Sequence, residues 1–260
     1  MNHVTRSDAA LPPGPGLGGW PRSPRDALGG TTWLRSVPDT TLNSLAGEAI
    51  LHRVPAGSIL FEQSETPALA QMVLAGSVAL LGVRESTEML VELIRPVDLL
   101  LPAAVLNRQP YLLRARVLEE AHLLILPAEA LRRAVCADHS LALALLACQA
   151  AQFRRQIKQA KNVRLRAAED RIGCYLLRLA EQAAPGQPAR LPLEKRLIAS
   201  ELGMTRETFS RTLPLLVRHG LRVEGDHVIL EDPVAARARF PLDPLIDGPE
   251  DVALLTAERK

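Results

Sequence analysis

The sequence has little cysteine and no long apolar run. Its 260 residues include three cysteines, Cys136, Cys148 and Cys174. This odd count, at spacings unlike those of zinc sites, predicts buried reduced thiols and no metal centre. No apolar run reaches the roughly 18 residues that a membrane-spanning helix needs, and the N-terminus has proline and glycine where a signal peptide has its apolar core. We therefore expect a cytoplasmic protein without a membrane partner.

The sequence also lacks the short motifs of common enzymes. It contains no Gly-x-Ser-x-Gly, no phosphate-binding loop, no zinc-ligand spacing and no convincing catalytic dyad. We therefore expect no enzymatic activity. Two other classes stay open at this point, a nucleic-acid-binding regulator and a protein that acts only through contacts with other proteins.

Basic residues are unevenly distributed along a chain of formal net charge +2. Residues 152–166 contain six basic and no acidic side chains, and residues 190–222 contain seven basic and three acidic ones, whereas the chain is acidic from Pro241 onward. A local basic field on a nearly neutral chain suits a phosphate-bearing partner, with an affinity that depends on salt.

The texture of the sequence divides the N-terminal half into two parts. Residues 1–30 are rich in proline, glycine and serine and have few large apolar residues, so we expect a disordered arm. Residues 31–136 alternate short apolar runs with turn residues at a spacing of about ten, which predicts an all-β roll. The expected strands lie near residues 58–61, 71–74, 77–81, 90–94, 114–118 and 122–126.

A long helix without glycine or proline is predicted over residues 137–168. Its apolar residues step by three and four and form a narrow stripe opposite a basic face, which is typical of a two-helix coiled coil. The alternative is a helix packed on its own domain. The residues expected at the dimer seam are Leu143, Leu146, Ala150, Phe153, Ile157 and Ala160.

Residues 169–235 have the pattern of a winged helix-turn-helix, followed by a tail over residues 236–260. Ala199 is small enough for two helices to approach closely, Gly203 supplies the turn, and Thr205 is a suitable N-cap for the second helix. Gly220 suits the end of that helix, and residues 221–230 predict a hairpin that turns at residues 224–226. The expected apolar interior consists of Leu197, Leu202, Met204, Phe209 and Leu213.

The second helix presents side chains that can recognise bases. Arg206, Glu207, Ser210 and Arg211 fall at helical spacings that place them on one face, next to Thr205. Arginine pairs with guanine, and glutamate accepts from cytosine, in the major groove of double-stranded DNA. The alternative is a structural helix pair or a protein-binding winged helix. Pro214 lies inside this helix and predicts a kink beyond the base-reading turn.

These motifs resemble those of the Crp/Fnr superfamily of bacterial transcription regulators. The strongest likeness is Arg206-Glu-Thr-Phe-Ser-Arg211, and it extends to residues 54–65 and 73–80 within a similarity over residues 35–232. Residues 191–200 are most similar to the Dnr-type, nitrogen-oxide-responsive branch. The resemblance implies an α+β protein with an N-terminal cyclic-nucleotide-binding-like β-roll, a dimerisation helix and a C-terminal winged helix-turn-helix.

The resemblance also implies how DNA is recognised. Arg211 would donate two hydrogen bonds to guanine, Glu207 would accept one from cytosine, Ser210 would contact thymine or its neighbour, and Arg206 would reach a second guanine or a phosphate. We expect a homodimer on a palindrome whose half-sites contain TGA, close to TTGAT, with RNA polymerase as a further partner. An effector would act by favouring one of two arrangements of the DNA heads about residues 162–170.

The effector stays open at the level of sequence. Where the family's cyclic-nucleotide motif has Gly-Glu and Arg-Ser, this chain has Leu101-Pro102 and Leu113-Arg114, which argues against a cyclic nucleotide, although Arg114 or Arg116 could contact a phosphate. An iron–sulfur cluster needs more thiolates than three cysteines supply. Haem stays open through His52 or His122. The apolar run at residues 98–106 suggests an apolar pocket or an interface.

Overall fold

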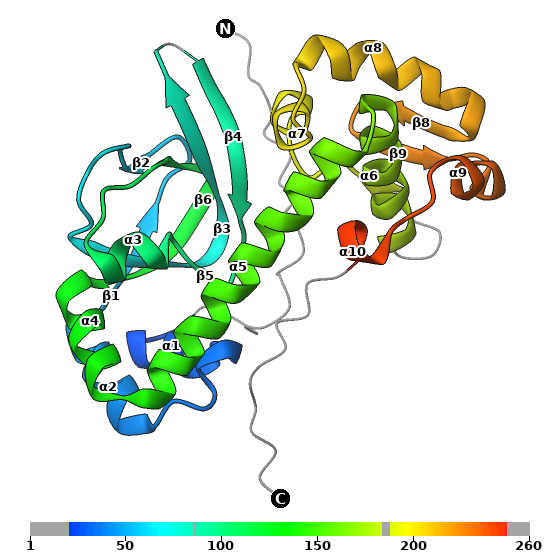
Figure 1. The fold of residues 1–260 in the computed structure, drawn as a ribbon. Coiled ribbons are helices and arrows are strands. Elements are labelled where there is room, and N and C mark those ends of the chain that lie inside the picture. Colours follow the sequence, from blue (N-terminus) through cyan, green and yellow to red (C-terminus); the bar gives the residue numbers. More distant parts are fainter. Residues whose placement is uncertain (1–20, 86, 184–187, 249–260) are drawn as a thin grey trace, which may run out of the picture.

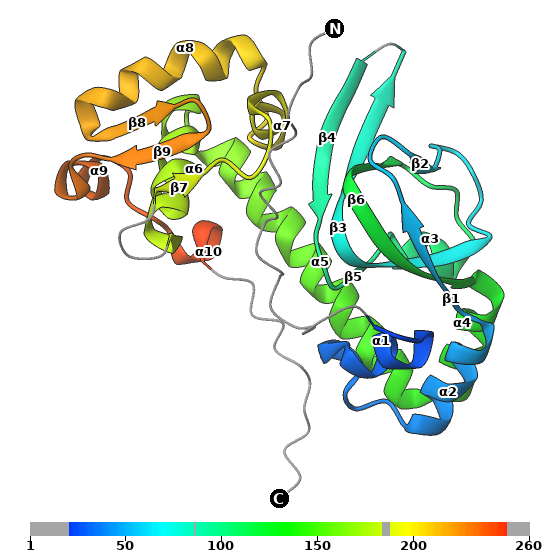
Figure 2. The same cartoon turned by 180° about the vertical axis from the view of Figure 1, so that it is seen from behind.

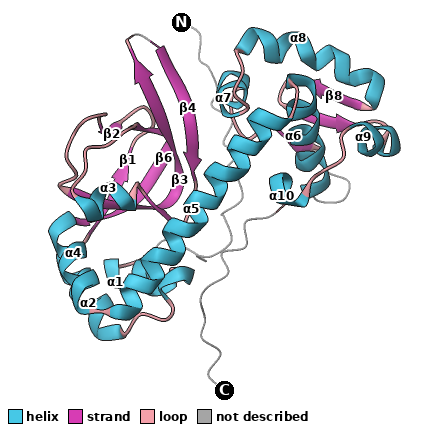
Figure 3. Ribbon diagram, in the orientation of Figure 1, coloured by secondary structure: helices cyan, strands magenta, loops and turns pink. Residues whose placement is uncertain are grey.

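The computed structural model describes residues 21–85, 87–183 and 188–248, which form two domains joined by one long helix, α5 (His139–Leu165; Figure 1). The N-terminal domain contains the larger sheet, and the C-terminal domain is mainly helical with a small sheet of its own (Figure 3). Within the described residues no single helix has the length and apolarity to cross a membrane, although the bent pair of α4 (Ala128–Ala137) and α5 together meets those two criteria.

The N-terminal domain is an antiparallel six-stranded sheet with the order β1-β6-β3-β4, in which β2 also pairs with β6 and β5 with β3. The predicted β-roll is therefore confirmed. Two pairs of predicted strands are each one long strand, because β-bulges let β3 and β6 bend without ending. At the bend Gly76 has φ of 79°, and a Cβ there would collide with the carbonyl of Glu120. The strands are β1 Ile50–Val54, β2 Ile59–Phe61, β3 Leu69–Arg84, β4 Thr87–Ile94, β5 Asp98–Leu99 and β6 Arg114–Pro127.

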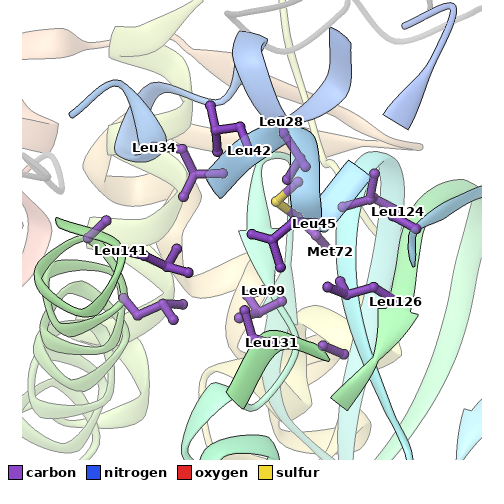
Figure 4. Close-up of a cluster of buried hydrophobic side chains, with 14 of the residues drawn as sticks. Leu28, Leu34, Leu42, Leu45, Met72, Leu99, Leu124, Leu126, Leu131 and Leu141 are labelled. Atoms are coloured by element: carbon purple, nitrogen blue, oxygen red, sulfur yellow. The ribbon is translucent and has the colours of Figure 1, made fainter. Parts of the chain in front are cut away.

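Short helices close one end of the roll around an apolar core (Figure 4). Leu28, Leu42 and Leu45 pack there against Met72 and Leu124 of the sheet, and all five are at most 4% exposed. The helices are α1 Pro24–Gly30, the 3₁₀ turn η1 Thr32–Leu34, α2 Asp39–Glu48, α3 Pro102–Asn107 and α4 Ala128–Ala137.

Helix α1 corrects the prediction that residues 1–30 are disordered. Residues 1–20 lie outside the described part of the chain, but Pro24–Gly30 is helical. Ser23 caps the helix by accepting from the Asp26 N–H, and Pro24 occupies the first turn, where no amide hydrogen is needed. Ala27 and Leu28 are buried in the core. Two apolar residues are enough to hold this short helix in place, because the rest of the domain provides the apolar surface against which they pack.

Helix α5, His139–Leu165, is capped by Asp138, whose carboxylate accepts from the N–H groups of Ser140 and Leu141. One face packs on the β-roll and buries Leu141, Leu145 and Cys148. After Leu165 the chain is extended at Arg166 and Ala167 before α6 begins. These two residues form the joint between the domains, within the predicted region 162–170.

The C-terminal domain contains a three-stranded sheet of order β7-β9-β8 and several short helices around one core (Figure 2). The domain extends past the predicted boundary at residue 235, because Ala236 and Phe240 are fully buried in its core. Its elements are α6 Ala168–Gln182, β7 Ala189–Arg190, α7 Lys195–Glu201, α8 Arg206–Leu216, the 3₁₀ turn η2 Val217–His219, β8 Leu221–Glu224, β9 His227–Leu230, α9 Pro233–Arg239 and α10 Pro244–Asp247.

Candidate nucleic-acid interface

Helices α7 and α8 form a tight helix-turn-helix. Ala199 is fully buried between them, and its carbonyl accepts from the Met204 N–H at 2.9 Å. Gly203 makes the turn at φ of 65°, a backbone conformation that glycine adopts without a steric cost. Thr205 caps α8, as predicted, by accepting from the Thr208 N–H at 3.2 Å. The first turn of α8 is therefore held in a defined orientation.

All four side chains predicted to read bases lie exposed on one side of α8. Arg206, Glu207, Ser210 and Arg211 are exposed, whereas Phe209, Thr212 and Leu216 are buried behind them. The figures show α8 along the outer edge of its domain, with its first turn next to α7 (Figures 1 and 2). Among the described residues neither Arg206 nor Arg211 has a salt-bridge partner, so both guanidinium groups face solvent.

Glu207 is an ionised acceptor at this surface. Its own backbone N–H and the Thr205 hydroxyl donate to it and lower its pKa, and the positive charges of Arg206 and Arg211 act in the same direction. A carboxylate at the N-terminus of a helix also gains from the helix dipole. The exposed end of α8 thus offers one ionised acceptor between strong donors.

One predicted interior residue faces elsewhere. Leu197 does not lie between α7 and α8 but packs against Leu81 and Leu90 of the β-roll, so that prediction was wrong. Ile198 takes the interior position instead and is fully buried, four residues before Leu202. The sequence offered both residues in succession, and the i, i+4 relation of Ile198 to Leu202 was the available signal.

Pro214 is accommodated within α8, which continues to Leu216 as one element. Pro214 has no N–H to donate to the Ser210 carbonyl, and its own side chain is exposed. The first two turns, which carry the candidate base-reading residues, precede it. Helix α8 is followed by η2, and Gly220 ends that turn at φ of 78°, as its predicted role as a C-cap requires.

The wing is the hairpin of β8 and β9, with Gly225 and Asp226 between the strands. This confirms the predicted turn. Arg222 on the wing is paired with Glu224 and, at 2.8 Å, with Glu231. The wing therefore contributes less free positive charge than its sequence suggests.

The basic run at residues 152–166 does not form one positive surface. Arg155 pairs with Glu92 at 2.9 Å and with Asp98, Lys158 donates to the Gly248 carbonyl, and Arg166 pairs with Asp247. The structure thus uses much of this charge inside the protein. The basic field that the sequence suggested for this stretch is correspondingly weaker.

The predicted dimer seam is an exposed apolar stripe on α5. Its six residues are all exposed, with Phe153 at 63%, Leu146 at 58% and Ile157 at 46%. The other face of the same helix packs on its own domain, which was the alternative interpretation. Each interpretation therefore describes one of the two faces of the helix. The exposed stripe contains Leu143, Leu146, Ala150, Phe153, Ile157 and Ala160.

The part of the β-roll that resembles a nucleotide site is occupied by its own side chains. Arg114 pairs with Glu62 at 2.7 Å and with Glu88, and Arg116 also pairs with Glu88. Leu99, Leu100, Pro102 and Val105 are buried in the domain, so the apolar run at residues 98–106 belongs to the core rather than to an open pocket or interface. His52 on β1 is exposed, and His122 on β6 is half-buried.

Comparisons with known proteins agree with this architecture. The family model of the cyclic nucleotide-binding domain matches residues 51–138 of this sequence. The family model of the Crp-like helix-turn-helix domain matches residues 170–237. No curated protein matches the chain.

Solved structures share the whole arrangement at low sequence identity. The c-di-GMP-responsive global regulator CLP of Xanthomonas campestris has a TM-score of 0.64 and 17% identity, over 75% of this chain and 100% of that one. FixK2 of Bradyrhizobium japonicum has a TM-score of 0.62 and 19% identity, over 75% and 98%. A CooA mutant from Carboxydothermus hydrogenoformans has a TM-score of 0.61 and 19% identity, over 74% and 88%. At these identities the likeness establishes the fold.

The two matched domains, in this order and joined by a long helix, define a DNA-binding transcription regulator rather than an enzyme. The chain belongs to the Crp/Fnr superfamily. Its placement in the Dnr-type branch stays a prediction from the sequence.

Proposed function

We propose that this protein is a sequence-specific regulator that binds, as a homodimer, a palindrome with half-sites close to TTGAT. The observation that carries the proposal is the exposed end of α8, where Arg206, Glu207, Ser210 and Arg211 project together from a capped helix. Arg211 and Glu207 supply the donor and the acceptor for a guanine–cytosine pair, and each such contact discriminates by about 1–3 kcal/mol. RNA polymerase would be the further partner of a regulator bound at a promoter.

The test is DNA binding by the full chain to a TTGAT palindrome and to a scrambled duplex, measured by mobility shift. We expect a clear preference for the palindrome, and Arg211→Ala should reduce that preference by about tenfold or more, because one bidentate contact is lost. Arg218→Ala is the matched control, since Arg218 is also exposed, on the following turn, but contacts Glu169. Undiminished preference in Arg211→Ala would contradict the proposal.

Dimerisation through α5 follows from the apolar stripe. Large apolar residues at a helical spacing, all exposed in one chain, favour burial against the same stripe of a second copy. A dimer would present two α8 helices, and their half-sites would then lie about one helical turn of DNA apart. If the protein acted only through contacts with other proteins, it would form a dimer through an intact β-roll and would show no preference for the palindrome.

We also propose that the β-roll does not bind a cyclic nucleotide in the manner of the matched domain. The support is that Arg114 and Arg116 are already paired with glutamates and that leucine and proline replace the glycine and glutamate of the motif. The affinity of the chain for cyclic AMP should therefore be the same in Arg116→Gln as in the wild type. Haem stays open, and a Soret band in the absorbance spectrum of the purified protein would establish it.

A further inference from the structure

A cleft of about 830 Å³ lies between the β-roll and the DNA-binding domain. Its walls come from the end of β4 and the loop after it, from α5 and α6, from the end of α7, and from the segments around η1 and α10. Figure 2 shows these elements grouped around α5 between the two domains. The cleft is distinct from the interior of the β-roll and from the exposed face of α8.

Buried polar atoms without a partner gather in this cleft. Across the described residues, six buried side-chain nitrogen or oxygen atoms have no hydrogen-bond partner, and four of them belong to residues that line it. They are Trp33 Nε1, Arg171 Nε, Tyr175 Oη and Glu201 Oε2. Tyr175 is only 6% exposed. Since buried polar groups are almost always satisfied, their concentration here indicates that a bound molecule supplies the partners.

The charges of the cleft specify the chemistry of that molecule. Arg95, Arg171 and Arg178 have no salt-bridge partner among the described residues, and the carboxylate of Glu201 lies in the same wall. The guanidinium of Arg178 lies 5.8 Å from the centre of the Tyr175 ring, and Arg171 Nη1 makes one long hydrogen bond, 3.4 Å, to the Gly203 carbonyl. Three cationic side chains without a salt bridge thus line the same cleft as Glu201, and the charges of two of them, Arg95 and Arg178, act on its carboxylate.

Burial makes the charged forms of Arg171 and Glu201 costly unless a bound ligand compensates them. It lowers the pKa of Arg171 and raises that of Glu201, while the positive charges of Arg95 and Arg178 partly restore the charged form of Glu201. On the other side of the cleft, the positive charge of Arg155 is already compensated, because Arg155 is paired with Glu92 and Asp98. The uncompensated charge thus lies at the end next to the helix-turn-helix.

We propose that this cleft binds a small phosphorylated molecule that also carries a hydroxyl or amino donor. The phosphate would lie among the guanidinium groups of Arg95, Arg171 and Arg178, which form strong charge-assisted hydrogen bonds with phosphate oxygens. The donor would satisfy Glu201, and the Tyr175 hydroxyl would donate to a ligand oxygen. A simple inorganic anion would satisfy the arginines but leave Glu201 without a donor.

The position of the cleft gives the ligand a consequence for the whole protein. Arg95 follows β4 of the β-roll, whereas Arg171 and Arg178 belong to α6 of the DNA-binding domain. A molecule that contacts all three links the two domains and stabilises the arrangement seen here. Any ligand that prefers one arrangement shifts the population toward it.

The test is calorimetric titration of the full chain, without DNA and at constant ionic strength. The probes are AMP and ribose 5-phosphate, which have both phosphate and donors, adenosine, which lacks the phosphate, and sulfate, which lacks the donors. Saturable binding of at least one phosphorylated probe, with weaker binding of adenosine and sulfate, is the expected result. Failure of both phosphorylated probes to saturate, or equal binding of sulfate, overturns the proposal.

Two substitutions locate the binding. Tyr175→Phe should raise the Kd about tenfold, because one hydrogen bond to the ligand is lost, without lowering the melting temperature, because the hydroxyl has no protein partner. Tyr111→Phe in the β-roll is the matched control, since its hydroxyl bonds to the Leu69 carbonyl and lies outside the cleft. If Tyr175→Phe and Arg178→Gln both bind as the wild type does, the site is elsewhere. Because DNA is absent, this failure leaves the proposed DNA recognition untouched.

Discussion

Pro214 is a residue whose local chemistry conflicts with its place in the fold. It lies in the third turn of α8, exposed, and leaves the Ser210 carbonyl without the amide donor of a regular helix. We therefore expect Pro214→Ala to stabilise the protein by about 1–3 kcal/mol, since alanine restores the hydrogen bond and suits a helix interior. Thermal unfolding followed by circular dichroism measures this gain.

Pro233→Ala is the matched control for that substitution. Pro233 is also exposed, but it stands at the first position of α9, where an amide hydrogen would have no partner within the helix. Its replacement should change the melting temperature little. A gain in Pro233→Ala equal to that in Pro214→Ala would show that the missing hydrogen bond is not the cause.

Most predictions about single residues in the helix-turn-helix were confirmed because local chemistry decides them. Thr205 caps α8, Gly203 and Gly220 have positive φ, and Phe209 is buried. Each depends on neighbours within a few positions in sequence. Leu197 was misplaced because its partner is Leu90, more than one hundred positions away, on a domain whose position the local pattern does not contain.

At the scale of elements, helix α5 has two apolar faces with different environments, one buried and one exposed. Its buried face holds the β-roll, and its exposed stripe includes Phe153 at 63% exposure. We expect Phe153→Asp to convert the proposed dimer to a monomer, because a desolvated carboxylate without a partner is costly in an apolar seam. Sedimentation equilibrium measures the change.

Leu112→Asp controls for the removal of an exposed apolar residue elsewhere. Leu112 is 81% exposed on the β-roll and is not part of the stripe. This variant should keep the oligomeric state of the wild type. An unchanged dimer in Phe153→Asp would contradict the proposed role of α5.

The joint between α5 and α6 is braced by α10. Arg166 donates to both carboxylate oxygens of Asp247, at 2.8 and 2.6 Å, and the two side chains are about 90% buried, at 11% and 10% exposure. Burial works to raise the pKa of Asp247, but the hydrogen bonds from Arg166 and from the Asp243 N–H outweigh it, so the pKa is lowered. A segment that the sequence showed only as an acidic tail thus stabilises the joint.

This pair predicts a pH dependence of stability. Because the pKa of Asp247 is lower in the folded than in the unfolded state, the stabilisation is present above about pH 4, the ordinary carboxyl pKa, and is lost as the pH falls through the folded value. Asp247→Asn should be less stable than the wild type at neutral pH, by about 3 kcal/mol, since it leaves Arg166 buried without a counter-charge.

Urea unfolding of both proteins across the acid range is the measurement. The difference in unfolding free energy should be constant above pH 5 or so and should narrow at lower pH. Asp243→Asn is not a suitable comparison, because Asp243 caps α10. Glu85→Gln is a suitable comparison, because Glu85 is exposed and has no salt bridge among the described residues, and it should show little pH-dependent difference. A difference for Asp247→Asn that does not depend on pH would contradict the assignment.

For the whole molecule, the contact between the two domains covers an unpaired sheet edge. Strand β4 is at the end of the sheet, and its Leu90 N–H donates to the Ser200 hydroxyl of α7 at 2.7 Å. Leu197 packs beside it, and Gln159 of α5 donates to the Glu201 carbonyl. An exposed edge strand favours unwanted pairing, so the first helix of the helix-turn-helix, α7, also protects the β-roll.

This docking makes the Leu90 amide a probe of domain arrangement. Ser200→Ala should speed the hydrogen exchange of that amide about tenfold, because one hydrogen bond is removed and the contact opens more often. Exchange measured by mass spectrometry or NMR without DNA gives the rate. Ser210→Ala, on the exposed face of α8, should leave the Leu90 rate unchanged. Equal rates in wild type and Ser200→Ala would show that this contact does not hold the domains together.

The sequence by itself determined the order of the elements and the identity of the exposed face of α8. Apolar periodicity, capping residues and turn residues act over a few positions, so the strands, the long helix, the cap at Thr205 and the hairpin at Gly225 could be predicted from them. The same periodicity separated Phe209 from Arg206 and Arg211. The likeness to a known superfamily added the order of the domains.

Only the tertiary structure decided which charges are free and where the domains meet. All arginines are alike in the sequence. In the structure, however, a carboxylate from a distant segment pairs with each of Arg114, Arg155 and Arg166, whereas Arg171 and Arg178 line a cleft. Electrostatic pairing and burial depend on distances across the fold. A composition or a local pattern contains no such distances, and for that reason the cleft and its unsatisfied groups became visible only once the chain was folded.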